Sequence, residues 1–208
     1  MPFAAILPPI PSGTELTALL VVVCFSAGLN VYATVAMLGL LGHAHVLALP
    51  PALSLVDNWY VIAICAVLFV VEFVGDKIPI FDLFWNAMHT FVRVPVAGLL
   101  TYGATAQLPE WERLVATLLG SLIALAAHSG KTAARAAVAH SPEPFSNIAL
   151  SLSEDALVVF LMWFATRHTY VAAGIAVAGL VVIAIAIHAV VRAMWNLFGD
   201  AGGALTKV

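Results

Sequence analysis

The sequence predicts an all-α integral membrane protein, built as a bundle of about six transmembrane helices. Of the 208 residues, 63% are hydrophobic and only 9% are charged, and the mean hydropathy is +1.06. A soluble domain carries about a quarter charged residues. A membrane-spanning helix needs about 20 mostly apolar residues, so this length allows about six spans with short connections and no soluble domain.

Long apolar stretches, separated by proline, glycine or charge, define the expected spans. Prolines near positions 50, 79, 109 and 142 break the first four connections, because proline removes a backbone donor and fixes φ. The spans are expected at residues 15–42, 58–76, 81–104, 112–140, 146–166 and 169–198. The membrane domain is then 15–198, between an apolar proline-rich segment at 1–14 and a tail at 199–208.

The segment before the first span contains no Lys or Arg, which a cleaved secretory signal requires at its start. We expect it to remain on the mature protein. With the N-terminus inside, the cytoplasmic side contains Lys77, Lys131, Arg135, Arg192 and Lys207, whereas Arg113 and Arg167 lie outside. Without Lys131 and Arg135, which can lie within the bilayer, the count is three against two. Cytoplasmic loops carry an excess of Lys and Arg, so we expect both termini in the cytoplasm.

Asn30 lies near the middle of the first expected span, beside Gly28 and shortly before Tyr32 and Thr34. Two interpretations are open. The Gly-Leu-Asn step is a local helix break whose backbone groups face a cavity. Alternatively, the glycine allows close helix packing while Asn30 and Thr34 form hydrogen bonds between helices.

About half of the charged residues lie in two short windows, 72–93 and 131–155. An unpaired charge at the middle of a membrane costs at least about 2.5–3.5 kcal/mol, so these residues must pair, meet water or serve a function. The connections between spans two and three and between spans four and five lie on one side of the bundle. Both windows therefore enter the membrane from the same side, and we expect them to line one hydrated cavity.

Helical spacing places several of these residues on common faces. On the third span, Asp82, Trp85 and His89 are spaced i, i+3 and i+7, and Arg93 follows His89 by four residues. On the fourth span, the same spacing applies to His128, Lys131 and Arg135. The expected counter-charges and polar partners are Glu72, Asp76, Glu154 and Asp155, with Asn147 and Ser151 one turn apart and Lys77 beside Asp76.

The stretch Ser-Pro-Glu-Pro-Phe-Ser-Asn at 141–147 resembles a stiff polar re-entry into the membrane. Its prolines prevent a continuous helix, and Glu143 and Asn147 can act as ligands or cap the fifth span. An anion can also bind at that helix start, where free N–H groups and the helix dipole favour negative charge.

Other site classes have weaker support. The formal net charge of −3 argues against nucleic acid as a partner. Cys24 and Cys65 lie in apolar runs and are expected to pack as small hydrophobic residues. His89, His128 and His140 with an acid could hold a metal, but their spacing is not specific and the nearby cations repel one. We expect no metal and no cofactor.

Internal similarity is limited. His89 and Arg93 match His188 and Arg192 at an offset of 99 residues, and the same offset lays the first span over the fourth. A true repeat of three spans would be inverted, as in many transporters, whereas chance similarity between apolar helices is the alternative. The Ala- and Gly-rich sixth span would suit a helix interface, so a homodimer is a further expectation.

Five motifs together resemble a bacterial integral-membrane family, the domain of unknown function DUF4126: GLNVYAT at 28–34, EFVGDKIP at 72–79, HSGKTAAR at 128–135, SPEPFSN at 141–147 and SEDA at 153–156. The resemblance covers roughly residues 17–166 and implies location in the bacterial inner membrane. The family brings no activity that can be transferred. It implies that these charged and polar residues fall at characteristic positions, among them Asn30, Glu72, Asp76, Lys77, Asp82, His89, Arg93, Lys131, Arg135, Glu143, Asn147, Glu154 and Asp155.

The residues favour a small transporter or channel-like protein whose charged cavity binds a small polar, anionic solute or a lipid headgroup. Arg93, Lys131 and Arg135 would attract the anion, with Asn30, Asn147 and Ser151 as further ligands. The acids with His89 or His128 would exchange protons and couple transport to the proton gradient. One alternative is a membrane-embedded enzyme for a lipid-linked or phosphorylated substrate, and another is a scaffold whose ion pairs only fix helix register.

Overall fold

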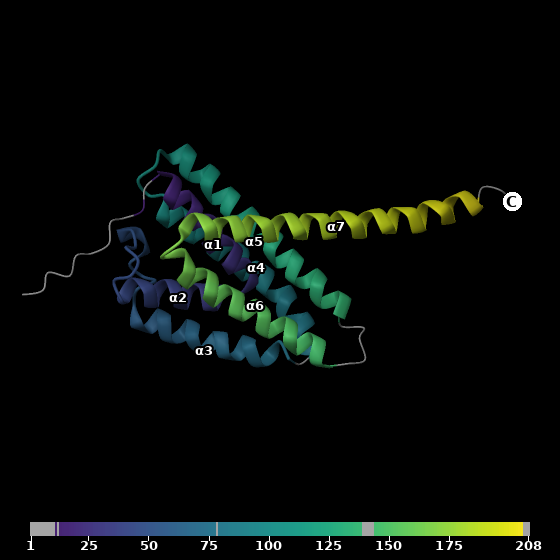
Figure 1. The fold of residues 1–208 in the computed structure, drawn as a ribbon, viewed down its shortest axis with the longest axis horizontal. Coiled ribbons are helices and arrows are strands. Elements are labelled where there is room, and N and C mark those ends of the chain that lie inside the picture. The colour runs from purple at the N-terminus through teal and green to yellow at the C-terminus, as the bar shows by residue number, and fades with distance from the viewer. Residues whose placement is uncertain (1–10, 12, 78, 139–143, 206–208) are drawn as a thin grey trace, which may run out of the picture.

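The computed structural model describes residues 11, 13–77, 79–138 and 144–205. All regular structure in these ranges is helical, so the all-α fold class is confirmed (Figure 1). The expected number of six helices is not confirmed. The described residues form seven α-helices and one short 3₁₀ turn. They are α1 (Gly13–Leu29), α2 (Val31–His43), η1 (Pro51–Leu53), α3 (Trp59–Gly75), α4 (Pro79–Ala104), α5 (Glu110–Val138), α6 (Pro144–Ala165) and α7 (Thr169–Leu205).

The first expected span is two helices that fold back on each other. Asn30 between them is extended, with φ −150° and ψ 104°. The Thr14 hydroxyl lies 3.1 Å from the Tyr170 hydroxyl, which places the start of α1 beside the start of α7. His43 lies 3.3 Å from Asp57, which places the end of α2 beside the start of α3. Since α3 and α7 begin at the same end of the bundle (Figure 1), α1 and α2 form a hairpin, here called the α1–α2 hairpin.

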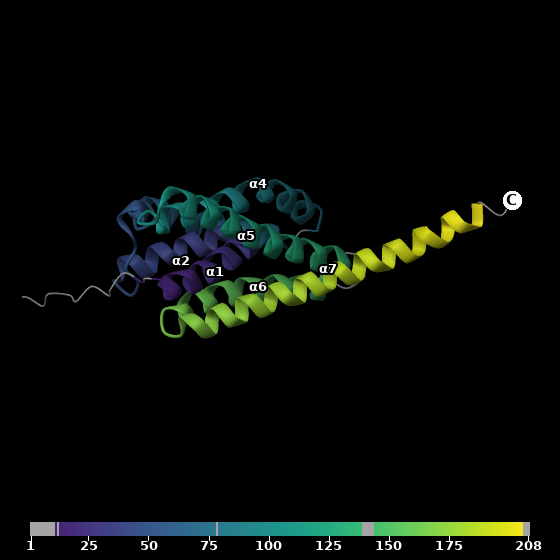
Figure 2. The ribbon, with the colours of Figure 1, turned by 90° about the horizontal axis from the view of Figure 1, so that it is seen from above.

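The α1–α2 hairpin enters and leaves at one end of the bundle, with its break buried inside. Helices of 17 and 13 residues extend about 26 Å and 20 Å at 1.5 Å per residue, less than the ~30 Å of a hydrocarbon core. Helices α3 to α7 then alternate in direction. The start of α1 and the end of α7 lie at opposite ends of the bundle (Figure 2).

The outer surface of the bundle is apolar, as expected for a protein surrounded by lipid. Among the described residues, three helical segments are long and apolar enough to cross a membrane: Glu110–Arg135, Ile148–Ala165 and Thr169–Ala189. At the end where α3 starts, exposed aromatic side chains come from α3, α4, α5 and α7. Tyr and Trp concentrate at membrane interfaces, so this aromatic end marks one of them. The residues are Trp59, Tyr60, Tyr102, Trp111 and Tyr170.

Helix α1 lies in the centre of the bundle and contacts α4, α5, α6 and α7. It is apolar on every side, which is typical of a buried helix. Glycines allow the close approach that this position needs. A Cβ on Gly28 would overlap the backbone of α5 at Ala124 and lie 2.7 Å from the Ala127 Cβ, whereas one on Gly174 would meet nothing within 4 Å.

The structure does not confirm the inverted repeat. His89 and Arg93 are buried, but His188 and Arg192 on α7 are exposed. The fourth expected span is the single unbroken helix α5, so the broken first span has no counterpart there. The two His-Arg pairs are therefore similar in sequence but differ in burial.

Gly28→Ala tests the close contact between α1 and α5. We expect it to lower the free energy of unfolding by about 2 kcal/mol, because overpacking forces backbone shifts. Gly174→Ala is the matched control and should be neutral or stabilising by up to about 1 kcal/mol, since alanine favours helix. Denaturant unfolding in detergent micelles measures both. Equal stability of the two variants would contradict the packing described here.

Candidate functional site

The helix break lies between two cations. At the end of α1, the carbonyl oxygen of Gly28 accepts a hydrogen bond of 3.2 Å from Arg93 on α4. The next carbonyl oxygen, of Leu29, accepts one of 3.0 Å from Lys131 on α5. The last carbonyl groups of a helix have no partners within the helix and carry partial negative charge. Arg93 and Lys131 therefore satisfy both the hydrogen-bonding and the electrostatic requirement of the buried end of α1.

Asn30 joins the other side of the break to α6. Its side-chain oxygen accepts a hydrogen bond of 2.9 Å from the Ala33 backbone N–H and so caps α2. Its amide nitrogen donates to the Asp155 Oδ1 at 2.9 Å. A carboxylate near a helix start is stabilised by the helix dipole. Features of both interpretations of Asn30 are present: the helix breaks at this residue, and Asn30 also bonds another helix beside the closely packed Gly28.

Lys131 and Arg135 connect the acids of α3 and α6. The Lys131 Nζ lies 3.4 Å from Glu72, 3.3 Å from Asp76 and 3.6 Å from Glu154. Arg135 donates to Asp76 at 2.6 Å and to Glu154 at 2.7 Å. Charge-assisted bonds of this kind are about twice as strong as neutral ones.

Arg93 completes this set of charges by pairing with Glu72. We call the whole cluster the ion network, and it consists of Glu72, Asp76, Arg93, Lys131, Arg135, Glu154 and Asp155. None of these residues is more than 9% exposed, so the side chains pack against one another and do not surround the open, hydrated cavity expected from the sequence.

The ion network has four acids and three cations. Asp155 is the acid with no ion pair to a described cation, because its Oδ1 bonds Asn30 and its buried Oδ2 has no partner among the described residues. The Glu72 Oε2, the Arg93 Nε and the Ser151 Oγ are likewise buried without partners there. Buried polar atoms are almost always satisfied, so the acid and hydroxyl oxygens can bind water, a proton or a ligand, and the Arg93 Nε–H can donate to water or a ligand.

His128 extends the ion network along α5. Its Nδ1 lies 2.8 Å from Arg93, and its Nε2 lies 2.8 Å from the Thr90 hydroxyl. Arginine has only donors, so Nδ1 must accept and the proton of the neutral ring is on Nε2. His128 thereby holds the Arg93 guanidinium in position.

His89 lies on the side of α4 that faces α2. Its Nδ1 lies 2.7 Å from the Trp85 carbonyl oxygen, and its Nε2 lies 3.0 Å from the Tyr32 hydroxyl. A carbonyl only accepts, so Nδ1 carries a proton. The two histidines therefore occupy different surroundings, and only His128 contacts the ion network among the contacts described.

The structure brings together most of the residues predicted for the site. Lys77 lies in the turn after α3, where its ammonium group donates to the Phe73 carbonyl at 2.5 Å and stacks on the Phe73 ring. Desolvation of its side chain lowers the pKa of Lys77 below its usual value, while Asp155 and Asp76 act in the opposite direction. Glu143 lies outside the described residues, and the same is true of the side chains of Asp82 and Asn147.

Sequence reasoning raised a break at the Gly-Leu-Asn step but did not identify the side chains that bind the Gly28 and Leu29 carbonyl groups. It also assigned no partner to Tyr32 and no role to Thr90, which are ordinary residues for an apolar helix. Within the described ranges, no group of three or more His, Cys, Asp or Glu is arranged to hold a metal ion.

Removing one partner of a buried ion pair should cost more than removing both. We expect Arg93→Met to lower the free energy of unfolding by about 3–5 kcal/mol, because Glu72 is left close to Lys131 alone. Adding Glu72→Gln should restore part of that loss, as a double-mutant cycle in micelles would measure. Arg167→Met, on an exposed residue, is the control and should change stability by less than about 0.5 kcal/mol. An Arg93→Met effect no larger than that of the control would exclude the pairing.

Comparison with known proteins identifies a family and no closer relative. The family model of a domain of unknown function, DUF4126, matches residues 17–190, which include the helix break at Asn30 and every member of the ion network. No curated protein and no solved structure matches the chain. The match covers well over half of the sequence, and we conclude that the chain belongs to the DUF4126 family.

Proposed function

We propose that the protein is a small transporter that moves an anionic solute together with protons. The observation that carries this proposal is the buried helix break, whose two ends are held by side chains of the ion network. In many transporters, broken helices place backbone groups and dipole ends around the substrate at the middle of the membrane. The α1–α2 hairpin offers the same elements.

The depth of the ion network supports this role. Along α4, Arg93 is nine residues from Tyr102 at the aromatic end, or about 14 Å. Along α6, Asp155 is eight residues from the exposed Trp163, or about 12 Å. Both distances correspond to about half of a ~30 Å hydrocarbon core. Charges at such depth are expensive and mark ion and substrate pathways.

The pairing of the ion network suggests how an anion and a proton bind together. Each cation is occupied by a carboxylate, the group that a small carboxylate or phosphate solute would replace. Protonation of Glu72 or Glu154 weakens these ion pairs and leaves Arg93, Lys131 or Arg135 available to a solute anion. Proton binding and anion binding are therefore mutually favourable, which is the requirement for proton-coupled symport.

Asp155 is a further candidate for the proton carrier beside Glu72 and Glu154, and it would act on the helix break instead of on an ion pair. It makes no ion pair with the described cations, its Oδ2 is unpartnered among the described residues, and it bonds the cap of α2. Loss or gain of its proton changes the charge facing that helix start. Because Asn30 is the hinge of the α1–α2 hairpin, such a change can be transmitted to both of its helices.

The orientation is also part of the proposal. Lys77 lies at the end opposite the aromatic end, and Arg192 lies on α7 toward that same end, whereas Arg113 and Arg167 lie at the aromatic end. The positive-inside rule then makes the aromatic end periplasmic in a bacterial inner membrane. A homodimer, through the exposed face of α7 around Gly174, remains a subordinate proposal.

The alternative functions have less support. A membrane enzyme would need a general base, but both ring nitrogens of His89 and of His128 are engaged by protein groups. A scaffold would be served by fully satisfied ion pairs, whereas the ion network leaves buried polar atoms without partners among the described residues.

Transport can be tested in proteoliposomes that contain the pH indicator pyranine. With an inward proton gradient, we expect external inorganic phosphate, sulfate or acetate to accelerate acidification of the lumen for at least one of these anions. Lys131→Ala should abolish the anion-dependent part, since it removes a cation from the solute site. Arg167→Ala is the control and should transport normally. Absence of anion-dependent proton flux for all three anions in the folded wild type counts against the proposal.

Asp155→Asn separates the proton carrier from the anion site. The variant keeps the size of the side chain and its contact with Asn30, but it cannot change charge. We expect it to bind the transported anion while losing the acceleration of uptake that low external pH gives the wild type. Uptake measured between pH 5 and pH 8 decides the point. An unchanged pH dependence would assign the proton to another acid of the ion network.

A further inference from the structure

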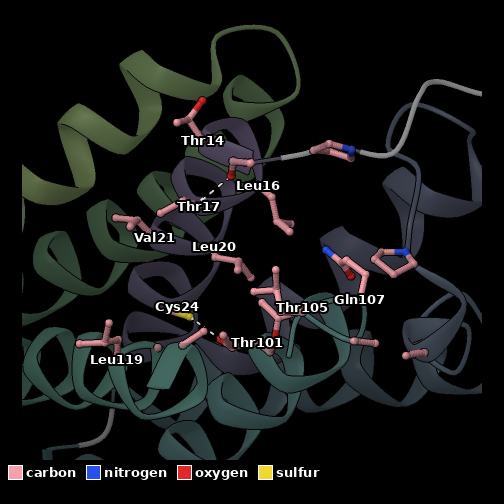
Figure 3. Close-up of a pocket in the computed structure, with 18 of the residues that line it drawn as sticks. Thr14, Leu16, Thr17, Leu20, Val21, Cys24, Thr101, Thr105, Gln107 and Leu119 are labelled. Carbon is pink, nitrogen blue, oxygen red and sulfur yellow. Dashed lines mark hydrogen bonds between the residues drawn. The ribbon is translucent and has the colours of Figure 1, made fainter. Parts of the chain in front are cut away.

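A large cavity lies at the aromatic end and shares no lining residue with the ion network (Figure 3). It has a volume of about 1080 Å³ and is bounded by the start of α1, the connection before η1, the end of α4 and the first half of α5. Pockets of about 300–1,000 Å³ enclose drug-sized molecules, so this cavity can hold a larger ligand. At its inner end, the Cys24 thiol donates to the Thr101 hydroxyl at 3.2 Å.

The cavity is apolar in chemistry. None of the described residues that line it is charged. Four threonines contribute hydroxyl groups, and all four hydroxyls are engaged by protein groups. Three donate to a carbonyl of their own helix, Thr17 to Gly13 at 3.1 Å, Thr101 to Ala97 at 2.9 Å and Thr105 to Thr101 at 2.7 Å, and the Thr14 hydroxyl lies 3.1 Å from the Tyr170 hydroxyl. With their donors used in this way, the cavity favours hydrocarbon over a polar solute. Apolar cavities stay dry and bind apolar ligands.

The cavity is also accessible from the lipid. Leu119 lines it and is 56% exposed, which places part of the wall on the outer surface of α5. Exposed Tyr102 on α4 and Trp111 on α5 lie at the level of the membrane interface. An acyl chain of the surrounding bilayer can therefore enter without crossing water.

A polar group and a cation lie where the headgroup of such a lipid would be. Gln107 lines the cavity in the connection between α4 and α5. Arg113 lies three residues before Ala116 of the lining, and its guanidinium stacks on Tyr102 and donates from Nε to the Tyr102 carbonyl at 2.8 Å. That contact fixes the cation at the interface, where lipid phosphate groups lie.

We propose that this cavity is a binding site for one membrane phospholipid. One acyl chain fills the space between Leu20, Leu119 and the Cys24–Thr101 contact, and the phosphate lies near Arg113 and Gln107. The site is independent of the transport proposal, because it uses no residue of the ion network. It is distinct from the general lipid surface because the chain is enclosed by three helices.

Two neighbouring leucines give a matched test. Leu119 and Leu118 are both exposed, at 56% and 65%, but only Leu119 is among the residues that line the cavity. Leu119→Trp places a larger side chain at the cavity wall, whereas Leu118→Trp places the same indole ring in the surrounding lipid. Displacing even two buried methylene groups weakens binding about tenfold.

The measurement is native mass spectrometry of protein released from nanodiscs of phosphatidylglycerol and phosphatidylethanolamine. At collision energies that strip surface lipid, we expect one phospholipid to remain on the wild type and on Leu118→Trp, and its occupancy to fall about tenfold on Leu119→Trp. Equal retention by both variants, or a wild type without retained lipid, would overturn the proposal.

A second measurement does not depend on how the tryptophan packs. A phosphatidylcholine with a photoreactive diazirine at the end of one acyl chain is reconstituted with wild-type protein and irradiated. We expect labelled peptides to include the buried residues Cys24 and Thr101 of the inner end. Labels confined to the outer faces of α3 and α7 would show that lipid contacts the protein only as a general solvent, and the site would be rejected.

Discussion

The fold depends on the contact between the last carbonyl groups of α1 and two cations from other helices. A helix that ends inside a membrane leaves polar backbone groups where no water can satisfy them. Arg93 and Lys131 donate to these groups at Gly28 and Leu29, while Asn30 caps the start of α2 and bonds Asp155. Without these side chains the α1–α2 hairpin would have to straighten into a single crossing helix, and the centre of the bundle would change.

The ion network follows from the same constraint. Cations that satisfy α1 are themselves buried charges and need counter-charges, which Glu72, Asp76 and Glu154 supply. The acids in turn fix the spacing of α3, α5 and α6 around the hairpin. The surplus acid, Asp155, lies on the positive end of α2, where a negative charge is best tolerated. The break between α1 and α2 thus accounts for the buried cations, and the cations account for the buried acids.

The sequence predicted most of the charged residues that meet in the ion network, although Lys77 and His89 lie outside it. Helical spacing placed Lys131 and Arg135 on one face of α5, and the alternation of spans placed the turn after α3 on the same side as the connection after α5. Both arguments are independent of the first span. The sequence did not predict the hairpin, because 28 apolar residues fit one crossing and the decisive partners of Gly28 and Leu29 come from distant helices. The lipid-facing cavity had no sequence signal, since its lining is uncharged and ordinary.

The α1–α2 hairpin also has a consequence for biosynthesis. A ribosome releases the N-terminal part of a chain first, and the N-terminal part normally folds first. Here the polar backbone of the break waits for Arg93, Lys131 and Asp155, which emerge much later. Helices α1 and α2 must therefore stay in contact with the insertion machinery, or cross the bilayer as one helix, until α6 is inserted and the hairpin can form.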